Sequence, residues 1–292
     1  PVGSGAGTQT SAFLAKGYNP GSAIATTQTW DGTSWSSAAD AATAAGYTSR
    51  GGGGASNTVG IVFGGSNAPG FTTPTFITST EEFTEPPVTQ AKLKEGMIFL
   101  SGGTTLKGFG KAGGIPSATW ASGGTMNTDR YQFGTAGTQT AALAFGGSSP
   151  PFTANNESYD GSSWTELNNL NSPRDALGSA GTQTAALGFG GQFPPVSNTY
   201  AITESWDGTN WTEVADLNSG RRFMNGTGNT NTAALLIGGY DGSNRAYVEN
   251  WDGTSWTEIA DINTARAYIA GVGTPEAALA ISGASGTNVE QW

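Results

Sequence analysis

Cysteine and histidine are both absent from this chain of 292 residues. Without cysteine the chain can form no disulfide, no thiolate zinc site and no cysteine nucleophile. Without histidine it lacks the commonest general base and the commonest transition-metal ligand. These absences remove much of the side-chain chemistry on which hydrolases and metalloenzymes depend, so we expect no metal, no other cofactor and no enzyme activity.

Charged residues are scarce as well. Asp, Glu, Lys and Arg make up 12 % of the chain, and the net charge is −10. A nucleic-acid-binding surface normally needs clustered Lys and Arg, so this balance argues against nucleic acid as a partner. No apolar run approaches the roughly 20 residues of a membrane-spanning helix, so we expect no membrane insertion. The sequence begins at Pro1 rather than Met, which leaves open whether the chain is processed or is part of a longer protein.

Glycine and aromatic residues are abundant instead. The chain has 46 Gly, about twice the usual share, together with 13 Phe, 9 Trp and 8 Tyr. That many aromatic residues argue against a disordered glycine-rich segment. The Thr, Val, Ile and aromatic content favours strands. The composition therefore predicts an all-β protein that is dense in turns.

One phrase recurs and sets the register of the chain. In it Asp-Gly separates two strand-forming runs, with a large aromatic residue at or near each end of the turn. Its copies are QTWDGTSW (28–35), ESYDGSSW (157–164), ESWDGTNW (204–211) and ENWDGTSW (249–256). Asp-Gly between two such runs is a strong hairpin signal. A hairpin repeated about every 45 residues indicates a propeller or a solenoid.

Two further elements accompany the hairpin. One is a short apolar run that ends in glycine, as in TAALAFGG (140–147), and seven copies of it can be counted, including GMIFLSGG (96–103). The other is a run of small residues, as in RDALGSAG (174–181), which is typical of a crowded innermost strand. Each unit then has four antiparallel strands, and radial repetition of such a unit gives a β-propeller. We expect seven blades, with six as the alternative, in a single domain over residues 1–292.

These residues resemble the kelch repeat. In that family an apolar strand ends in Gly-Gly and is followed by an aromatic residue and then by Trp, as Gly190-Gly191, Trp206 and Trp211 are here. The resemblance covers nearly the whole chain and implies a kelch-type β-propeller. More narrowly, the phrases AGTQTAALAFGG and WDGTSWTE resemble kelch-like proteins of tailed phages of aquatic bacteria. That resemblance implies a protein of the virion or of an extracellular surface.

Two regions depart from the pattern. Residues 83–123 lack the Asp-Gly hairpin and hold four of the five lysines: Lys92, Lys94, Lys107 and Lys111. We expect a diverged, Lys-rich third blade here, with Trp120 on its outer strand and the lysines either solvated or forming a docking patch for an acidic neighbour. The last unit stops after Trp292 at its third strand. It stays three-stranded, is completed by residues 1–8, or is completed by chain beyond these residues.

Strand order sorts the side chains by face. Because propeller strands run alternately up and down, the loops after the double glycines and the loops that enter the inner strands share one face, the loop face. Five arginines fall there, near the channel mouth: Arg50, Arg130, Arg174, Arg222 and Arg266. Arg130, Arg174 and Arg222 lie 16 residues before the first glycine of their pair, as Arg174 does before Gly190, and Arg266 lies 16 residues before Ser282, which takes that place in the last unit. The resemblance implies that this position sometimes binds acidic peptides, and the alternative is a structural role in which the guanidinium bridges adjacent blades through backbone carbonyls.

The loop face also carries segments that differ in length and sequence between units, which is where recognition residues usually lie. We single out seven aromatic residues and one arginine in them: Tyr18, Phe71, Phe76, Phe152, Phe193, Tyr200, Tyr240 and Arg245. Exposed aromatic residues beside Asn, Ser and Asp favour stacking on sugar rings or a protein contact. The alternative is packing over the loops' own prolines or against a neighbouring subunit of a homo-oligomer.

These features predict a non-enzymatic structural or recognition protein. We expect a virion-associated propeller whose loop face contacts other virion proteins or host-surface glycans. Two alternatives stay open, an adaptor that binds acidic peptides through its arginines and a carbohydrate-active enzyme. A glycosidase needs two carboxylates that flank its substrate, and few acidic residues lie outside the repeats. The strictly repeated Trp and Asp-Gly residues are interpreted as scaffold, between blades and in turns respectively.

Overall fold

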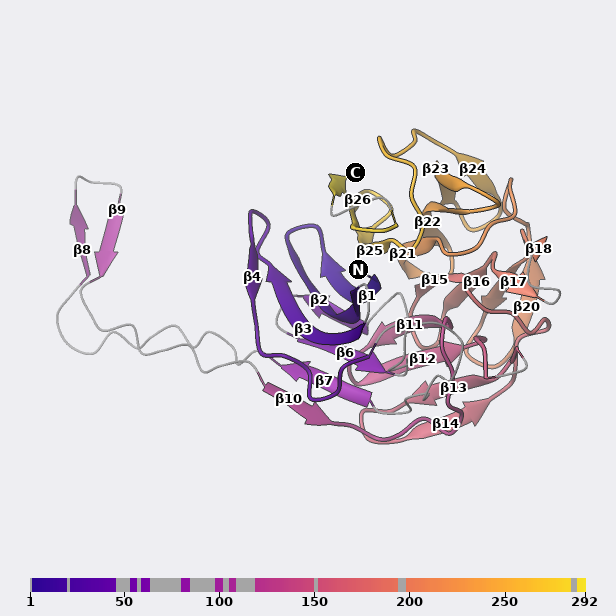
Figure 1. Ribbon diagram of the computed structural model, residues 1–292, viewed down its shortest axis with the longest axis horizontal. Coiled ribbons are helices and arrows are strands. Elements are labelled where there is room, and N and C mark those ends of the chain that lie inside the picture. The colour runs from indigo at the N-terminus through magenta and orange to yellow at the C-terminus, as the bar shows by residue number, and fades with distance from the viewer. Residues whose placement is uncertain are drawn as a thin grey trace.

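A computed structural model describes residues 2–19, 22–45, 53–56, 59–63, 80–84, 98–101, 105–108, 119–149, 152–193, 198–284 and 288–292. The strands of this described part form six blades arranged around an axis (Figure 1). The predicted all-β propeller is therefore confirmed, but the count of seven blades is wrong and the alternative of six is right. No helix able to cross a membrane occurs in the described ranges.

Four blades follow the expected order of inner strand, double-glycine strand and hairpin. The first consists of β1 (Val2–Thr8), β2 (Ser11–Asn19), β3 (Ser22–Trp30) and β4 (Trp35–Ser37). The third consists of β11 (Gly134–Thr138), β12 (Ala141–Phe145), β13 (Asn156–Tyr159) and β14 (Trp164–Leu167). The fourth consists of β15 (Gly178–Gly181), β16 (Ala186–Phe189), β19 (Thr203–Trp206) and β20 (Trp211–Val214). The fifth consists of β21 (Asn225–Thr230), β22 (Ala233–Tyr240), β23 (Asn244–Trp251) and β24 (Trp256–Glu258).

The second blade contains a long insertion. Its strands are β5 (Gly53–Ser56), β6 (Val59–Phe63), β7 (Thr80–Thr84) and β10 (Thr119–Ser122). Phe83 and Trp120 face each other across the β7–β10 ladder, so both ends of residues 83–123 belong to one blade. Between them, β8 (Ile98–Ser101) and β9 (Thr105–Gly108) pair with each other in a separate two-stranded sheet.

The expected third blade at residues 83–123 is therefore an insertion in the outer hairpin of the second blade. The apolar run at 98–101 has the composition of a double-glycine strand, but it pairs within its own hairpin instead of lying between an inner and a third strand. Trp120 does lie on the outer strand, as expected. Counting apolar runs thus gave one blade too many.

The ring closes between the sixth and the first blade. The sixth blade has three strands, β25 (Ala270–Thr274), β26 (Ala277–Ile281) and β27 (Val289–Gln291). Residues 2–8 form β1 and pair with β2, so they do not complete the sixth blade. Instead the inner strands β1 and β25 lie against each other, and Gln9 Nε2 donates to the Trp292 carbonyl at 3.3 Å. Apolar residues of the two blades, among them Ala12 and Val272, form one buried cluster at this contact.

The repeated tryptophans lock neighbouring blades together. Trp256 packs its ring 4.9 Å from that of Phe189 in the preceding blade, and its Nε1 donates to Thr203 Oγ1 at 3.0 Å. Trp164 makes the same bond to Thr80 at 3.0 Å. Both indoles are almost fully buried. The interpretation as scaffold is confirmed for Trp164 and Trp256, because both bury a large ring and pair the N–H across a blade contact, and Trp211 packs its ring 4.6 Å from that of Phe145 in the preceding blade.

The Asp-Gly pairs form tight turns on the face opposite the loop face. At the third blade, Asp160 Oδ1 accepts the backbone N–H groups of Ser162 and Ser163 at 2.9 and 2.8 Å, and Gly161 has φ +94°. These hydrogen bonds lower the pKa of Asp160 to about 2. A Cβ on Gly161 would lie 3.6 Å from Thr140, which belongs to the turn after the inner strand. Both kinds of turn thus share one face, the turn face, as strand order predicts.

Candidate recognition face

Three of the singled-out aromatic residues meet on the loop face. The ring of Phe193 lies 6.4 Å from that of Phe152 and 6.5 Å from that of Tyr200, measured between centroids. Phe193 belongs to β17 (Gln192–Phe193), which pairs with β18 (Asn198–Thr199) in a small hairpin of the fourth blade. Since side chains alternate along a strand, Gln192 is buried while Phe193 is 38 % exposed. We call Phe152, Phe193 and Tyr200 the aromatic trio.

Tyr240 and Arg245 lie together in the fifth blade but outside the trio. Tyr240 is half-buried beside Phe223, and the Arg222 guanidinium lies 5.4 Å from its ring centroid. Arg245 Nε donates to both carboxylate oxygens of Asp241 at 2.8 Å. These two residues are therefore engaged by their own blade.

The other singled-out loop and insertion residues lie outside the described side chains. Phe71, Phe76, Arg50, Lys92, Lys94 and Lys111 fall outside the described residues altogether. For Tyr18 in β2 and Lys107 in β9 only the backbone is described. The expected Lys docking patch stays a prediction.

Three of the expected channel-mouth arginines are buried instead. The side chains of Arg130, Arg174 and Arg266 are 0 to 1 % exposed, and each forms an ion pair with the glutamate that opens the hairpin phrase of its own blade. Burial lowers the pKa of Arg130 to about 10 although Glu157 opposes the shift, so the guanidinium stays charged at neutral pH. These guanidiniums do not reach the surface to meet an acidic peptide.

In the fifth blade the equivalent arginine is Arg221 rather than Arg222. Arg221 Nη1 bonds Glu249 Oε1 at 2.5 Å, and both side chains are buried. Arg222 instead bonds Gln192 of the fourth blade and lies over the rings of Phe223 and Tyr240. Arg222 is thus not equivalent to Arg130, Arg174 and Arg266, because one extra residue in this blade, Asn229, shifts the 16-residue spacing by one.

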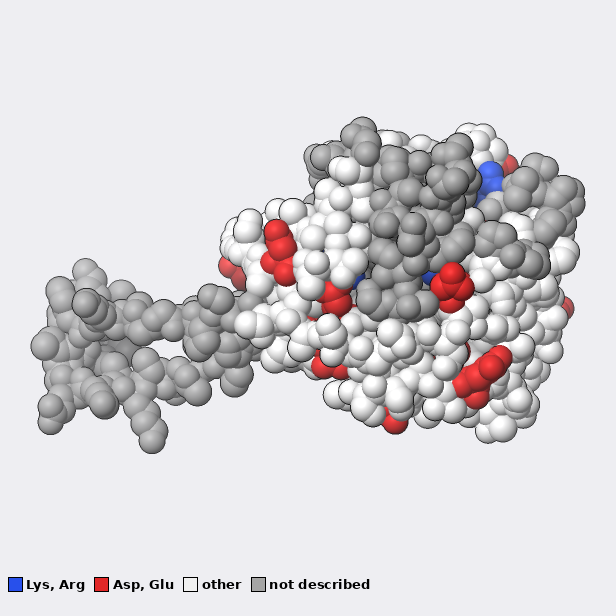
Figure 2. All heavy atoms as spheres, turned by 60° about the horizontal axis from the view of Figure 1, so that its bottom comes forward, with Lys and Arg blue, Asp and Glu red and all other residues white. Residues whose placement is uncertain are grey.

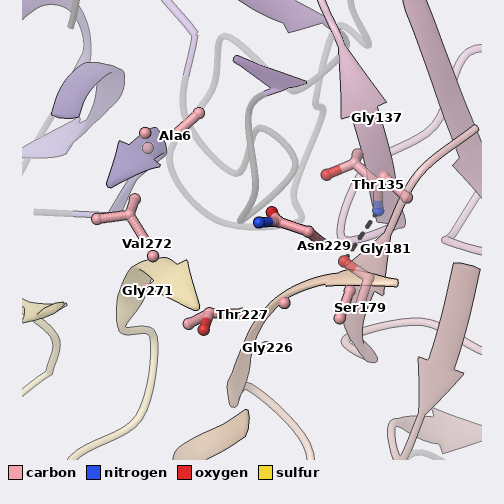
Figure 3. A pocket seen from close by; sticks show the side chains of 16 residues that line it. Ala6, Thr135, Gly137, Ser179, Gly181, Gly226, Thr227, Asn229, Gly271 and Val272 are labelled. Atoms are coloured by element: carbon pink, nitrogen blue, oxygen red, sulfur yellow. Dashed lines mark hydrogen bonds between the residues drawn. The ribbon is translucent and has the colours of Figure 1, made fainter. Parts of the chain in front are cut away.

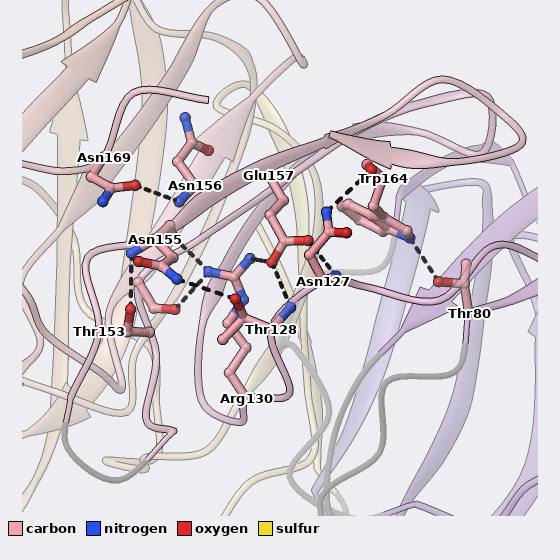
Figure 4. Close-up of polar contacts among 11 residues, drawn as sticks. Thr80, Asn127, Thr128, Arg130, Thr153, Asn155, Asn156, Glu157, Trp164 and Asn169 are labelled. Atoms are coloured by element: carbon pink, nitrogen blue, oxygen red, sulfur yellow. Dashed lines mark hydrogen bonds and ion pairs between the residues drawn. The ribbon is translucent and has the colours of Figure 1, made fainter. Parts of the chain in front are cut away.

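The glutamates bond the linkers between blades as well as the arginines, as Figure 4 shows for Glu157. Glu157 accepts the backbone N–H groups of Asn127 and Thr128 at 2.7 and 3.2 Å, in addition to Arg130 at 2.5 Å. The Asn127 side chain in turn donates to the Trp164 carbonyl at 3.1 Å. The role of the arginines is therefore structural. Arg130 donates to the Glu157 carboxylate and to the Gly146 and Asn155 carbonyls, so the expected bonds to carbonyls are present, but they lie within one blade and do not bridge adjacent blades.

The second and first blades vary this arrangement. Glu81 takes the glutamate position of the second blade, and its partner is Lys16 of the first blade at 2.6 Å. Lys16 stands where the third to fifth blades have glycine and keeps the positive φ of that position, 56°. The first blade has the neutral Gln28 where the others have glutamate. Sequence reasoning overlooked Lys16 because it has no counterpart in the repeat.

A ring of non-glycine residues with positive φ surrounds the channel mouth. Gln132, Ala176, Phe223 and Tyr268 each follow a buried arginine by two positions and have φ between 55 and 60°. Their backbones form a chain across the blades, with N–H to carbonyl distances of 2.7, 2.9 and 2.8 Å. The Phe223 and Tyr268 rings are stacked with centroids 4.3 Å apart. Gln132, Ala176 and Phe223 are buried, so the mouth is packed on this side.

The face of the molecule that Figure 2 shows carries little charge. On the face that Figure 2 shows, Asp and Glu outnumber Lys and Arg, and most of the described surface belongs to uncharged residues. Among the described residues, no group of three or more Asp or Glu side chains could hold a metal ion.

Comparison with known proteins identifies the fold alone. No family model and no curated protein matches the chain. Among solved structures, the structure of YjhT matches with a TM-score of 0.68 and 12 % sequence identity, over 100 % of this chain and 94 % of that one. At that identity the likeness agrees with the β-propeller described above and goes no further.

Proposed function

We propose that this protein is a non-enzymatic recognition protein whose loop face binds a glycan or a neighbouring protein. The observation that carries the proposal is the aromatic trio. Phe193 is one of three large apolar side chains that are exposed in the described part of the chain, and two further rings flank it. Aromatic residues are enriched where proteins meet their partners, and their faces cover the apolar side of a sugar ring.

The surroundings favour a neutral glycan among the possible partners. The trio lies in segments that differ between blades, whereas the buried Arg, Glu and Trp residues repeat from blade to blade. Residues that vary on a constant scaffold are the ones available for recognition. The trio consists of two Phe and one Tyr and contains no Lys or Arg, so an uncharged ligand fits it better than an acidic peptide.

A glycan array tests this proposal. The protein is expected to bind a subset of neutral glycans, and Phe193→Ala and Tyr200→Ala are expected to weaken that binding at least tenfold. Trp292→Ala is the matched control, because Trp292 is a similarly exposed aromatic residue, 43 % exposed, at the end of β27 toward the turn face. Unchanged binding by both trio variants would refute the role of the trio.

We further propose that the protein is displayed on a virion or another extracellular surface, where it contacts other surface proteins. The support is the resemblance of its repeat phrases to phage-encoded proteins and its low content of charged residues. Mass spectrometry of purified particles tests this location. If the protein were absent from the particles, the virion assignment would be overturned, whereas the proposal of glycan recognition would be unaffected.

The two alternative functions have less support. An adaptor for acidic peptides needs accessible arginines, and Arg130, Arg174 and Arg266 are occupied by glutamates. A glycosidase needs a carboxylate pair at its substrate, and Glu157, Glu204 and Glu249 are fully buried against arginine. The buried ion pairs thus give the repeated glutamates a structural role, which explains why they recur without a catalytic one.

A further inference from the structure

A second candidate binding site lies on the axis, at the turn face. A cavity of about 90 Å³ is lined by the inner strands β1, β11, β15, β21 and β25 near their ends (Figure 3). Its lining side chains are small, mostly Gly, Ala, Ser and Thr, and none of them is charged. This end of the channel is opposite the aromatic trio, so the cavity is separate from the site of the proposed function.

Crowding explains most of the small residues. A Cβ on Gly226 would lie 2.3 Å from the Ser179 carbonyl oxygen of the neighbouring blade, and one on Gly5 would lie 3.4 Å from Val272. Gly137 has φ +103° in a tight turn, where a side chain would be strained. The small lining is therefore a requirement of blade packing and is no evidence for a ligand.

Asn229 is not explained in this way. The third blade runs from its inner strand into the turn as Gly-Thr-Gln-Thr (137–140), whereas the fifth blade reads Gly-Asn-Thr-Asn-Thr (228–232), with Asn229 as the additional residue. The pairing of β21 with β22 shifts register between Thr227 and Thr230, as a β-bulge does. Figure 3 shows the Asn229 side chain pointing into the cavity. Bulges commonly re-aim a side chain at a functional site.

Thr227 supplies a second polar group at the same place. It lines the cavity, is 4 % exposed, and its Oγ1 has no hydrogen-bond partner among the described residues. A buried hydroxyl without a partner is costly, so its retention needs a reason. Ser179, on the neighbouring inner strand β15, uses its Oγ to accept the Thr135 N–H at 3.1 Å. Thr227 and Asn229 thus add a hydroxyl and an amide that blade packing does not require.

We propose that this cavity binds a small uncharged polyhydroxy molecule of about the size of a monosaccharide, with Asn229 and Thr227 as polar contacts. Asn and Thr side chains both donate and accept hydrogen bonds, which matches hydroxyl groups. A charged ligand would lose its hydration without finding an opposite charge. One water occupies ~10–15 Å³ of such volume, so the cavity of about 90 Å³ holds roughly six to nine waters. That room accommodates a hexose at the open end of the channel.

NMR titration of the isotope-labelled protein tests the site. The probes are D-glucose, D-galactose and myo-inositol, each added separately. We expect at least one of them to shift the Asn229 side-chain amide and the backbone amides of Gly226 and Gly228. Deletion of Asn229 recreates the shorter turn of the third blade, and it is expected to weaken binding at least tenfold, as is Thr227→Val. Thr254→Val, at an exposed turn on the same face, is the matched control and is expected to bind like the wild type.

Several outcomes would overturn the inference. The first is that none of the three probes shifts any resonance. The second is that the Asn229 deletion binds the probes with the same affinity as the wild type. The third is that a metal ion binds the cavity more tightly and displaces every probe. If the deletion variant does not fold, Asn229→Ala keeps the chain length and decides in its place. Loop-face glycan binding that persists in a folded Asn229 variant shows that the two sites are separate, so each can fail alone.

Discussion

The Arg174 guanidinium and the Glu204 carboxylate meet at 2.5 Å in the interior of the fourth blade, although 30 residues separate them in the chain. Glu204 also accepts the backbone N–H and the side-chain amide of Asn171, at 2.7 and 2.8 Å. Glu204, the first residue of the repeated phrase in this blade, thus holds the linker between the third and fourth blades in place through these hydrogen bonds. Its neighbour Trp206 secures the same strand by donating to the Gln183 carbonyl at 3.0 Å.

Glu204→Gln is expected to destabilise the protein strongly. The substitution keeps the size of the side chain but leaves the Arg174 charge buried without a counter-charge, which typically costs about 3–5 kcal/mol. Urea unfolding measures the change in the free energy of unfolding. Asp241→Asn is the control, because the Arg245–Asp241 pair is more exposed and such pairs contribute about 0–1 kcal/mol. Equal effects of the two variants would contradict the structural role of the buried pair.

Arg221 and Arg222 are expected to respond very differently to substitution. Arg221→Ala removes the counter-charge of the buried Glu249 and is expected to cost about 3–5 kcal/mol. Arg222→Ala removes a half-buried side chain over Phe223 and Tyr240 and is expected to cost about 0.5–3 kcal/mol. Thermal unfolding of the two variants side by side measures the difference. The reverse order would contradict the assignment of Arg221, rather than Arg222, to the buried pair with Glu249.

The parts of the fold that repeat locally could be predicted from the sequence. An Asp-Gly turn, the two strands beside it and the aromatic residue at each end are set by neighbouring residues, so their pattern identifies them. The blade count could not be obtained in this way. The apolar run at 98–101 resembles a double-glycine strand in composition, and only its pairing with 105–108 shows that it belongs to an insertion.

The arginine set shows which further signal the sequence held. Each buried arginine is preceded three residues earlier by an asparagine, in Asn127-x-x-Arg130, Asn171-x-x-Arg174, Asn218-x-x-Arg221 and Asn263-x-x-Arg266. This motif selects Arg221 correctly, whereas spacing from the glycines does not. The aromatic trio had no such signal, because loop residues meet only through the packing of two blades.

Thr203→Val is expected to weaken the contact between the fourth and fifth blades. The substitution keeps the shape of the side chain but removes the hydroxyl that accepts the Trp256 indole N–H, and a buried donor left without a partner costs about 1–3 kcal/mol. In a Trp256→Phe background that donor is absent, so the same substitution is expected to cost much less. Urea unfolding of the four proteins of this cycle gives the coupling energy. A coupling near zero would show that the hydrogen bond adds nothing to the packing of Trp256 on Phe189.

Lowering the pH from about 4 to about 2 is expected to remove the contribution of the Asp-Gly turns to stability. Hydrogen bonds from the turn, chiefly the backbone N–H of Ser163 at Asp160 and the Thr254 hydroxyl at Asp252, lower the pKa of both carboxyls from their ordinary value of 3.8 to about 2. Because the folded-state pKa lies below the unfolded value, their contribution to stability is complete above about pH 4 and is lost as the pH falls through about 2.

Carbon-13 titration of the side-chain carboxyls measures these two pKa values in the folded protein. Midpoints near the ordinary value would show that the turn hydrogen bonds do not favour the charged form. Asp160→Asn and Asp252→Asn are the matched variants, since an amide oxygen still accepts the turn N–H groups but does not titrate. The stability of a double variant is therefore expected to fall less steeply than that of the wild type between pH 4 and pH 2. An unchanged slope would place the acid sensitivity of the protein elsewhere.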